Sequence, residues 1–378
     1  MLRTTSLSFM SLVLMAILPL AVCGADAASG LKEGAPDLKS AGPLAFGPAG
    51  ILFVADPLGA AVFAIDTGDG ADKAAGPASS AKEIKVENIN EKVAALLGTS
   101  PQDIAINDLA VNPLSGKAYL SISRGLGPNP IPVIVRVSSA GDIQALPLEK
   151  IKFAKASLPD APSADPPKDQ GKRRGNARLE SITDLAFVDG SLLVAGLSNE
   201  EFASTLRSIP YPFKDVAKGT SVEIYHGAHG KLETHSPVRT FVPFKVGGES
   251  HLFAAYQCTP LVTFPLSKLK PGEHIKGRTV AELGNRNRPL DMVVYKKDGK
   301  DYLLIANSSR GVMKLSTENV EKAESITEEV KGGGTKGLPY DTIEELKGID
   351  QLDRLDEKHA LVVRRSDAGE LHLETIAL

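Results

Sequence analysis

The stretch INDLAVNPLSGKAYLSISRG, residues 106–125, decides the fold. It reads as a strand, a Pro/Gly turn, and a second strand that ends in small residues before a polar corner. The pattern recurs along the chain, and the other copies span residues 42–67, 182–202, 238–266, 289–316 and, in a weaker form, 348–378. A unit of this kind cannot bury both faces of its strands alone, so we expect the units to stack on one another.

Small residues at matching places indicate how the units stack. The second strand of four copies ends near Ala55, Ala195, Ala255 or Ala306, which suits a crowded radial arrangement. The sequence therefore predicts an all-β, six-bladed β-propeller around a central channel. A terminal strand from residues 31–38 would complete the last blade and remove an open sheet edge. A seven-bladed propeller, with residues 203–245 split into a further blade, and a β-sandwich pair are the alternatives.

Few segments have helical spacing. Residues 91–98 and 341–348 are the two candidates. Residues 154–178 are rich in proline and charge, which predicts an exposed loop insertion. The basic cluster inside that loop consists of Lys172, Arg173 and Arg174, and we interpret it as solvated.

Composition excludes some functions. The chain has 378 residues, with 43 Lys and Arg against 46 Asp and Glu, and a formal net charge of −3. This balance argues against a nucleic-acid binder. Hydrophobic residues make up 42% of the chain, as in ordinary globular proteins. The 35 Gly and 25 Pro residues indicate many short elements joined by tight turns.

The N-terminus predicts export. Residues 1–27 combine a basic residue, an apolar run and a small-residue cleavage site, as in a secretory signal peptide. We therefore expect a periplasmic or secreted protein, with residues 28–378 as a single propeller domain. Cys23 also sits in a lipoprotein-like box, so a lipid anchor is the alternative. After processing, Cys258 is the one remaining free thiol, and we expect a monomer with no intrachain disulfide and no transmembrane segment.

Acidic residues recur at the start of the innermost strand. They are Asp108, Asp184, Asp291 and Asp350, while the fourth copy has Thr240 and the first has Pro43. In a propeller these carboxylates would converge near the axis, where they repel one another unless they are neutralised. Oxygen ligands favour Ca²⁺ or another divalent cation. The alternative is that each Asp accepts hydrogen bonds from backbone N–H groups and joins neighbouring blades.

The same segments resemble a known family. GPLAFGPAGILFVAD (42–56), INDLAVNPLSGKAYLS (106–121) and RPLDMVVYKKDGKDYLLIA (288–306) are similar to phrases of SMP-30/gluconolactonase-like and NHL-type six-bladed propellers. The resemblance implies that Asn107 and Asp291 contribute to a divalent metal in a lactonase-type centre. The family's first metal ligand is a Glu before Gly-Pro, and this chain has Ala41 there.

Other propeller families are excluded by the absence of Trp. The chain has no Trp-Asp blade signature, no kelch Gly-Trp pair and no Trp docking motif of the quinoproteins, so we expect no PQQ. The glycine-rich segment 330–341 lacks the P-loop spacing, so we expect no nucleotide and interpret the segment as a connector between blades.

The polar corners after the second strands carry three arginines. Arg124 and Arg310 occupy equivalent Ser-Arg-Gly corners, and Arg207 lies in the 198–213 segment, which we interpret as a lid or partner-contact loop. Together they could clamp a carboxylate, sulfate or phosphate. Salt bridges between blades are the alternative. Cys258 lies in the same set of corners and completes the predicted ligand-binding group.

Four histidines cluster between residues 226 and 251. The motif HGAH spans residues 226–229, and His235 and His251 follow. The two His of the motif have a spacing that binds a transition metal if both rings turn inward. The alternative reading of the motif, from its glycine, is a hairpin turn.

Two functions follow from these patterns. The first is a non-enzymatic binding module that holds an anionic small molecule or a partner protein at one mouth of the ring. The second is a divalent-metal-dependent hydrolase of the lactonase type, in which the cation polarises a carbonyl and activates water.

Overall fold

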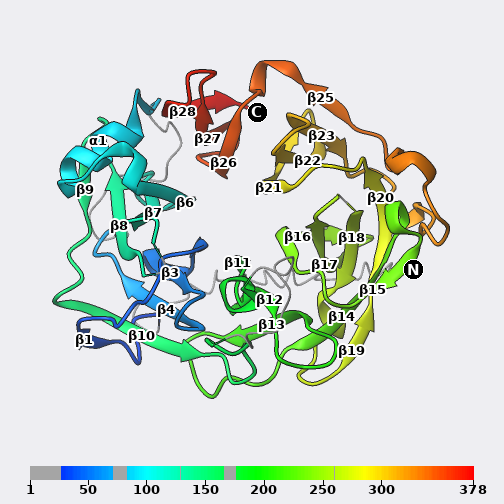
Figure 1. The fold of residues 1–378 in the computed structure, drawn as a ribbon, viewed down its shortest axis with the longest axis horizontal. Helices are drawn as coiled ribbons and strands as arrows, with labels where there is room; N and C mark the ends of the chain where they lie inside the picture. Colours follow the sequence, from blue (N-terminus) through cyan, green and yellow to red (C-terminus); the bar gives the residue numbers. More distant parts are fainter. Residues whose placement is uncertain (1–26, 71–82, 128, 166–175, 259) are drawn as a thin grey trace, which may run out of the picture.

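Six β-sheets surround a central channel in the computed structural model (Figure 1). The structure describes residues 27–70, 83–127, 129–165, 176–258 and 260–378. Each sheet begins with an inner strand at the axis and continues outward through antiparallel neighbours. The predicted six-bladed β-propeller is therefore confirmed. Residues 1–26 of the predicted signal segment, including Cys23, and the basic residues 172–174 lie outside the described part.

Blades 1 and 2 come from the N-terminal part of the chain. Blade 1 has the strand order β2-β3-β4-β10-β1, and blade 2 the order β6-β7-β8-β9. Their strands are β1 (Lys32–Gly34), β2 (Leu44–Phe46), β3 (Ile51–Asp56), β4 (Ala61–Asp66), β6 (Ile104–Val111), β7 (Ala118–Arg124), β8 (Ile131–Val137), β9 (Ile143–Ala145) and β10 (Ile151–Ser157).

Blades 3 and 4 occupy the middle of the chain. Blade 3 has the order β11-β12-β13-β14-β15, with β19 added in parallel to β14, and blade 4 the order β16-β17-β18-β20-β24. Their strands are β11 (Asp184–Val188), β12 (Ser191–Leu197), β13 (Ser204–Pro210), β14 (Thr220–His226), β15 (Lys231–Glu233), β16 (Val238–Val246), β17 (Glu249–Tyr256), β18 (Pro260–Pro265), β19 (His274–Lys276), β20 (Arg278–Leu283) and β24 (Thr335–Gly337).

Blades 5 and 6 complete the ring. Blade 5 has the order β21-β22-β23-β25, and blade 6 the order β26-β27-β28-β5. Their strands are β5 (Lys85–Val86), β21 (Pro289–Lys297), β22 (Lys300–Asn307), β23 (Val312–Ser316), β25 (Asp341–Ile343), β26 (Ile349–Arg354), β27 (His359–Arg365) and β28 (Leu371–Ala377).

The blades do not follow one another around the ring in chain order. The inner strands contact one another in the order β2, β6, β26, β21, β16, β11 and back to β2, so the ring runs 1-2-6-5-4-3 (Figure 1). After blade 2 the chain returns to blade 1 through β10, and only then continues to blade 3 on the other side.

Two blades are each closed by a strand from a distant part of the chain. The predicted closure by residues 31–38 is wrong: β1 pairs with β10 at the edge of blade 1. Instead β5 pairs with β28 and completes blade 6. The two-residue length of β5 and its isolation from other apolar runs hide it from sequence patterns. Both pairings cover exposed sheet edges and join the N-terminal third of the chain to the rest.

Apolar residues of the repeats form the core. Six clusters of buried side chains each lie between two adjacent blades. The strand β3 is buried along its whole length, as are all but the last residue of β4. Such strands are buried on both faces, because each blade packs against a neighbour on either side, which explains the continuous Val/Ile/Leu/Phe runs in the repeats.

The segments between the repeats differ in part from their predicted structure. The helix predicted over 91–98 is present as α1 (Ile89–Leu97), whereas residues 341–348 form β25 and a short 3-10 turn. The predicted loop 154–178 begins inside β10, where Ala156 is buried, and part of the connector 330–341 forms β24 of blade 4. Among the described residues, no helix combines the length and apolar character needed to cross a membrane.

Candidate functional site

The recurrent aspartates join the blades around the axis. One carboxylate oxygen of Asp184 accepts the N–H of Leu185 at 2.7 Å, and the other accepts the N–H of Phe241 on blade 4 at 2.7 Å. Asp291 makes the same pair of contacts, with the N–H of Met292 and with an N–H of blade 6. Each carboxylate therefore bridges its own strand and the next blade, and this contact is the backbone-joining alternative of the sequence prediction.

The four bridging aspartates all point the same way around the ring. Each accepts an N–H from the blade that follows, and the bridges are Asp184 to Phe241, Asp291 to Leu352, Asp353 to Val111 and Asp108 to Leu44, at 2.6–2.8 Å. Blade 1 has Pro43 and blade 4 has Thr240 at this place. The junctions from blade 1 to blade 3 and from blade 4 to blade 5 therefore lack this bridge among the described residues.

The small residues on the second strands face these aspartates. Ala195 pairs with Asp184, Ala306 with Asp291, and Ser121 with Asp108. Each of these three partners is fully buried. A larger side chain would push the inner strand into the axis, so the small residues and the aspartates belong to one structural device.

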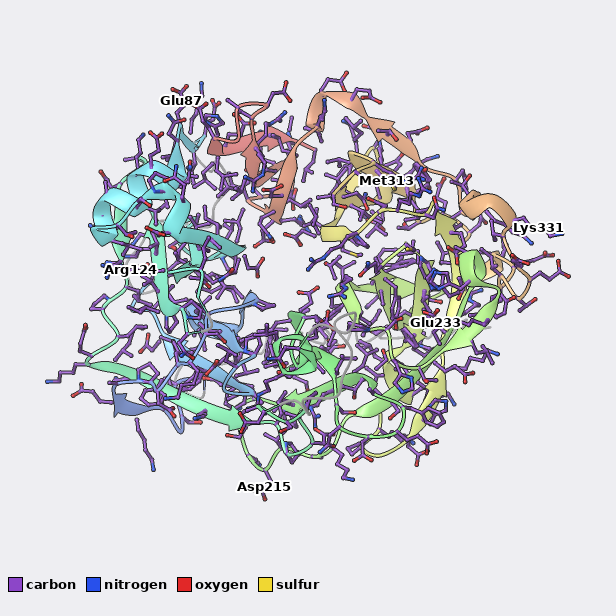
Figure 2. The ribbon with its side chains drawn as sticks, in the orientation of Figure 1. Glu87, Arg124, Asp215, Glu233, Met313 and Lys331 are labelled. Carbon is purple, nitrogen blue, oxygen red and sulfur yellow. The ribbon has the colours of Figure 1, made fainter. Side chains whose placement is uncertain are left out.

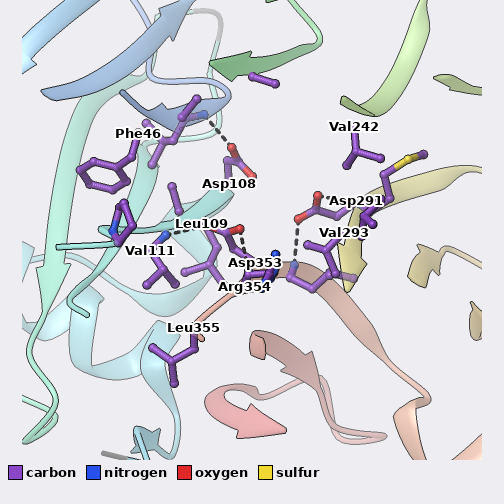
Figure 3. A pocket seen from close by; sticks show the side chains of 18 of the residues that line it. Phe46, Asp108, Leu109, Val111, Val242, Asp291, Val293, Asp353, Arg354 and Leu355 are labelled. Carbon is purple, nitrogen blue, oxygen red and sulfur yellow. Dashed lines mark hydrogen bonds between the residues drawn. The ribbon is translucent and has the colours of Figure 1, made fainter. Parts of the chain in front are cut away.

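Blade 6 carries its bridge on a different residue from the predicted one. A bulge in β26 shifts the register between Ile349 and Gln351, so Asp350 faces away from the bridge and pairs with Arg365 at 2.5 Å. Asp353, one pleat further along the strand, makes the contact to Val111 instead (Figure 3). The assignment of Asp350 to the axial set is wrong. The bulges at matching places in the other inner strands would have identified Asp350 as the bulged residue, but the sequence pattern alone does not show them.

Burial raises the pKa values of the axial carboxylates. Desolvation raises the pKa of Asp184 to about 7 and that of Asp353 to about 6. The pKa values of Asp108 and Asp291 also lie well above the usual range, because burial and the neighbouring carboxylates disfavour the charged forms. Bonds from backbone N–H groups oppose these shifts without cancelling them.

The channel consists of two chambers that meet at Asp108, Asp184 and Asp291. The apolar chamber, about 1330 Å³, is lined by the later residues of the inner strands, including Phe46 and Val293, and by the 354–359 turn (Figure 3). The polar chamber, about 590 Å³, is lined by the residues just before and at the start of the inner strands. The three aspartates form the boundary between them.

Bulged residues line the polar chamber. The registers of β6, β16 and β21 each skip one residue, namely Asn107, Arg239 and Leu290, and all three line this chamber. A bulge turns the extra residue out of the regular pleat, here toward the axis. The equivalent residue in blade 6, Asp350, does not line it. Gln351 lines the chamber instead and donates to the Asn107 carbonyl at 3.2 Å.

Two arginines that the sequence reasoning missed lie in the polar chamber. Arg239 of blade 4 pairs with Glu180 at 2.7 Å and is 14% exposed. Arg288 precedes β21 of blade 5, and its guanidinium has no hydrogen bond or ion pair among the described residues. Desolvation by the surrounding chain and the charge of Arg239 lower the pKa of Arg288, although its side chain is exposed to solvent. It stays protonated at neutral pH because the ordinary value is so high. Both sit at the junction from blade 4 to blade 5.

The three predicted arginines are not brought together. Arg207 is 4% exposed inside blade 3, where it pairs with Asp160 and donates to the Ala217 carbonyl, so it does not reach a mouth. Arg310 donates to the Asn285 carbonyl at 2.9 and 3.2 Å. Arg124, at the end of β7, lies outside the lining of both chambers (Figure 2). Their spacing in the sequence could not show which face of each strand they occupy.

The other residues that were predicted to contact a ligand or partner are parts of the blades. Cys258 is half-buried at a corner of blade 4, with φ of 61°, and its N–H donates to the Asn287 carbonyl. The predicted lid 198–213 contains β13, the third strand of blade 3. Its aromatic residues Tyr211 and Phe213 are partly buried and pack against Phe53 of blade 1, at the edge of the core.

The lactonase-type metal centre does not fit the residues present. The Asn107 amide nitrogen donates to the Ala41 carbonyl at 2.7 Å and to Ser123 Oγ at 2.8 Å. The Asp291 oxygens already accept two backbone N–H groups. Ala41 offers no side-chain oxygen. The donor set of such a centre is therefore incomplete here, and we derive no step through a cation at the axis.

Comparisons with known proteins leave the family open. No family model and no curated protein matches the chain. Solved structures that it resembles include a putative oxidoreductase (glucose dehydrogenase) of Thermus thermophilus, at 14% identity and a TM-score of 0.35 over 92% of this chain and all of that one. A PQQ-bound aldose sugar dehydrogenase of Streptomyces coelicolor matches at 12% identity and a TM-score of 0.31 over 92% of this chain and 97% of that one.

A plexin A4 extracellular region also matches, at 8% identity and a TM-score of 0.41, over 92% of this chain and 40% of that one. Similarities this low carry no argument about function. The propeller assignment rests on the sheet topology of the chain itself.

Proposed function

We propose that the polar chamber binds a small molecule that carries an anionic group at one end and hydroxyl groups at the other. The observation that carries this proposal is the solvent-exposed guanidinium of Arg288, which lines a concave chamber beside Arg239 and has no hydrogen bond or ion pair among the described residues. The binding module of the sequence analysis is thus retained, with a different pair of arginines.

The charges around the two arginines of the chamber favour an anion. Two guanidinium groups lie beside one carboxylate, that of Glu180, so this wall has a net charge of about +1. Arginine binds carboxylate and phosphate groups through two parallel N–H donors. An anion that contacts Arg288 would also reduce the repulsion between Arg288 and Arg239.

The aspartates that border the chamber favour hydroxyl groups. Asp108, Asp184 and Asp291 border the chamber, and beside the backbone N–H groups that they accept, their carboxylates have further lone pairs for a hydroxyl donor. Asn107 and Ser123 add further polar atoms. A ligand with hydroxyl donors toward the aspartates and an anionic group toward the arginines would match both sets of side chains.

The size of the chamber favours a small ligand over a protein surface. About 590 Å³ is the volume of an ordinary small-molecule site. A partner protein needs a wide contact area outside such a cavity. The hydrolase alternative lacks a donor at Ala41, where the lactonase-type family has a Glu, so we propose binding without chemistry.

Thermal melting with three probes tests the proposal. Glucose 6-phosphate carries both features, whereas glucose lacks the anion and inorganic phosphate lacks the hydroxyl-bearing ring. We expect the first to raise the melting temperature most, because ligand binding stabilises the native state.

Arg288→Glu should remove the stabilisation, and Arg124→Glu, the same charge change outside both chambers, should keep it. Equal responses of the two variants, or no response of the wild-type protein to either anionic probe, would overturn the proposal.

A further inference from the structure

The outer edge of blade 3 carries a cluster of histidine and glutamate residues away from the axis. The strand β14 ends at His226, a 3-10 turn covers Gly227–His229, and β15 follows as the second strand of the hairpin. The turn places His229 directly over His226, with the ring centroids 3.8 Å apart. The hairpin turn predicted for HGAH is therefore present, and the two rings face each other, with His226 buried and His229 46% exposed.

Glu233 connects the two rings. Its Oε2 lies 3.0 Å from His226 Nδ1, and its Oε1 lies 2.7 Å from His229 Nδ1. One donor atom from each of the three residues lies within 4.8 Å of the other two. Ser236 Oγ donates to Glu233 Oε2 at 2.8 Å and holds the carboxylate in place. Two imidazoles and a carboxylate form a donor set that Zn²⁺ prefers.

Blade 4 places a second carboxylate against this hairpin. Glu282 of β20 is 1% exposed, and its Oε1 accepts the N–H of Gly227 at 2.5 Å. A side chain on Gly227 would collide with Glu282 and Val330, so only glycine allows this approach. The hairpin and β20 are therefore in direct contact at the junction of blades 3 and 4.

Two buried polar atoms at this junction have no hydrogen-bond partner among the described residues. They are Nε2 of His226, which is 2% exposed, and Oε2 of Glu282. Leaving such atoms unpaired in the interior is energetically unfavourable. A buried carboxylate with a free oxygen beside two imidazoles indicates a place where positive charge is needed.

We propose that His226, His229 and Glu233 bind Zn²⁺, with Glu282 as the neighbouring carboxylate that balances the charge. Two glutamates and two neutral imidazoles match the double charge of the ion. The three ligands leave a fourth position for water. Zinc–ligand bonds of about 2.0–2.1 Å require the three donor atoms to lie around one point, and their present separations allow this after small side-chain rotations.

Because zinc binds deprotonated ligand atoms, its affinity should fall at low pH. The ion would join the edge of blade 3 where it meets β20 of blade 4. This site does not depend on the proposed ligand of the polar chamber.

Isothermal titration of the chelator-stripped protein with Zn²⁺ tests the proposal. We expect one equivalent to bind to the wild-type protein and to raise its melting temperature. His229→Ala removes a ligand whose side chain is 46% exposed, so folding should persist while binding is lost. Glu282→Gln should weaken binding by about 10–100-fold, as for other residues that support a metal ligand.

His235→Ala is the matched control, because His235 is exposed and bonds Thr234 outside the cluster. Its zinc affinity should equal that of the wild-type protein. The proposal is overturned if the wild-type protein binds no zinc, or if His229→Ala and His235→Ala bind it equally well. Glu233→Gln provides a second ligand variant, and retained binding in it would contradict the proposal in the same way.

Discussion

Carboxylates at the axis and at the edge of the propeller have opposite surroundings. At the axis, burial raises the pKa of Asp184 to about 7 despite hydrogen bonds from two backbone N–H groups. At the edge, burial also favours the neutral form of Glu233, but hydrogen bonds from His226, His229 and Ser236 lower its pKa to about 2. Figure 2 shows Glu233 out in the ring wall, away from the channel.

This difference in surroundings distinguishes a carboxylate that joins blades from one that can bind a metal. Backbone N–H groups cannot leave, so the axial carboxylates are committed to joining the blades. Imidazole side chains can exchange a proton for a metal ion while they keep their positions. A recurrent Asp in a repeat is therefore weaker grounds for a metal site than a single group of mixed donors.

The largest expected effect is on the pH dependence of stability. The pKa of Asp184 is about 7 in the native protein, against an ordinary value of 3.8 for an aspartate in an unfolded chain, so the native state binds more protons between these values. Its stabilising contribution is complete below the unfolded pKa and is lost as the pH rises through 7. Asp184→Asn removes this titration, and the two proteins should differ in pH dependence by about 4 kcal/mol over this range.

Urea unfolding at a series of pH values measures this difference. The contribution of Glu233 has the opposite sign. Its lowered pKa of about 2 stabilises the protein above the unfolded value and is lost as the pH falls toward 2. Parallel stability curves for the wild-type protein and Asp184→Asn would contradict the role given to the axial carboxylates.

A smaller effect distinguishes bridging aspartates from the one that was wrongly assigned. Asp291→Ala removes both acceptors of a bridge between blades 5 and 6 and should cost about 3 kcal/mol. Asp350→Ala removes a partly exposed ion pair with Arg365 and should cost about 1 kcal/mol or less. Denaturant midpoints at pH 5 measure both, and similar losses would mean that the bridges contribute little.

The smallest expected effect concerns Glu180, the ion-pair partner of Arg239 in the polar chamber. Glu180→Gln removes the charge that pairs with Arg239 while it keeps the shape of the side chain. Stability should change by about 0.5 kcal/mol, whereas affinity for glucose 6-phosphate should rise, because the chamber gains positive charge. A fall in affinity would show that Glu180 orients Arg239 for binding.

The sequence predicted the fold because its repeats are long and apolar. Six copies of one hairpin pattern specify six blades, and small residues such as Ala195 and Ala306 mark the crowded inner positions. The order of the blades around the ring, in which blades 1 and 2 are reversed relative to chain order, was not predictable. It depends on β5 and β10, which pair with segments far away in the chain.

The candidate site was predicted only in part. Asp108, Asp184 and Asp291 do converge at the axis, since the repeat fixes their position. Arg239 and Arg288 were missed, because a β-bulge in one case and a turn before the strand in the other turn them into the chamber. Glu233 lies on the same hairpin as the HGAH motif, whereas only the ring brings Glu282 of blade 4 beside it.

Anomalous diffraction at the zinc absorption edge, from crystals soaked in Zn²⁺, tests the central distinction between the axis and the edge most directly. We predict one peak, between His226, His229 and Glu233, and no peak near Asp108, Asp184 and Asp291. A peak at the axial aspartates with none at the histidine cluster would contradict this distinction.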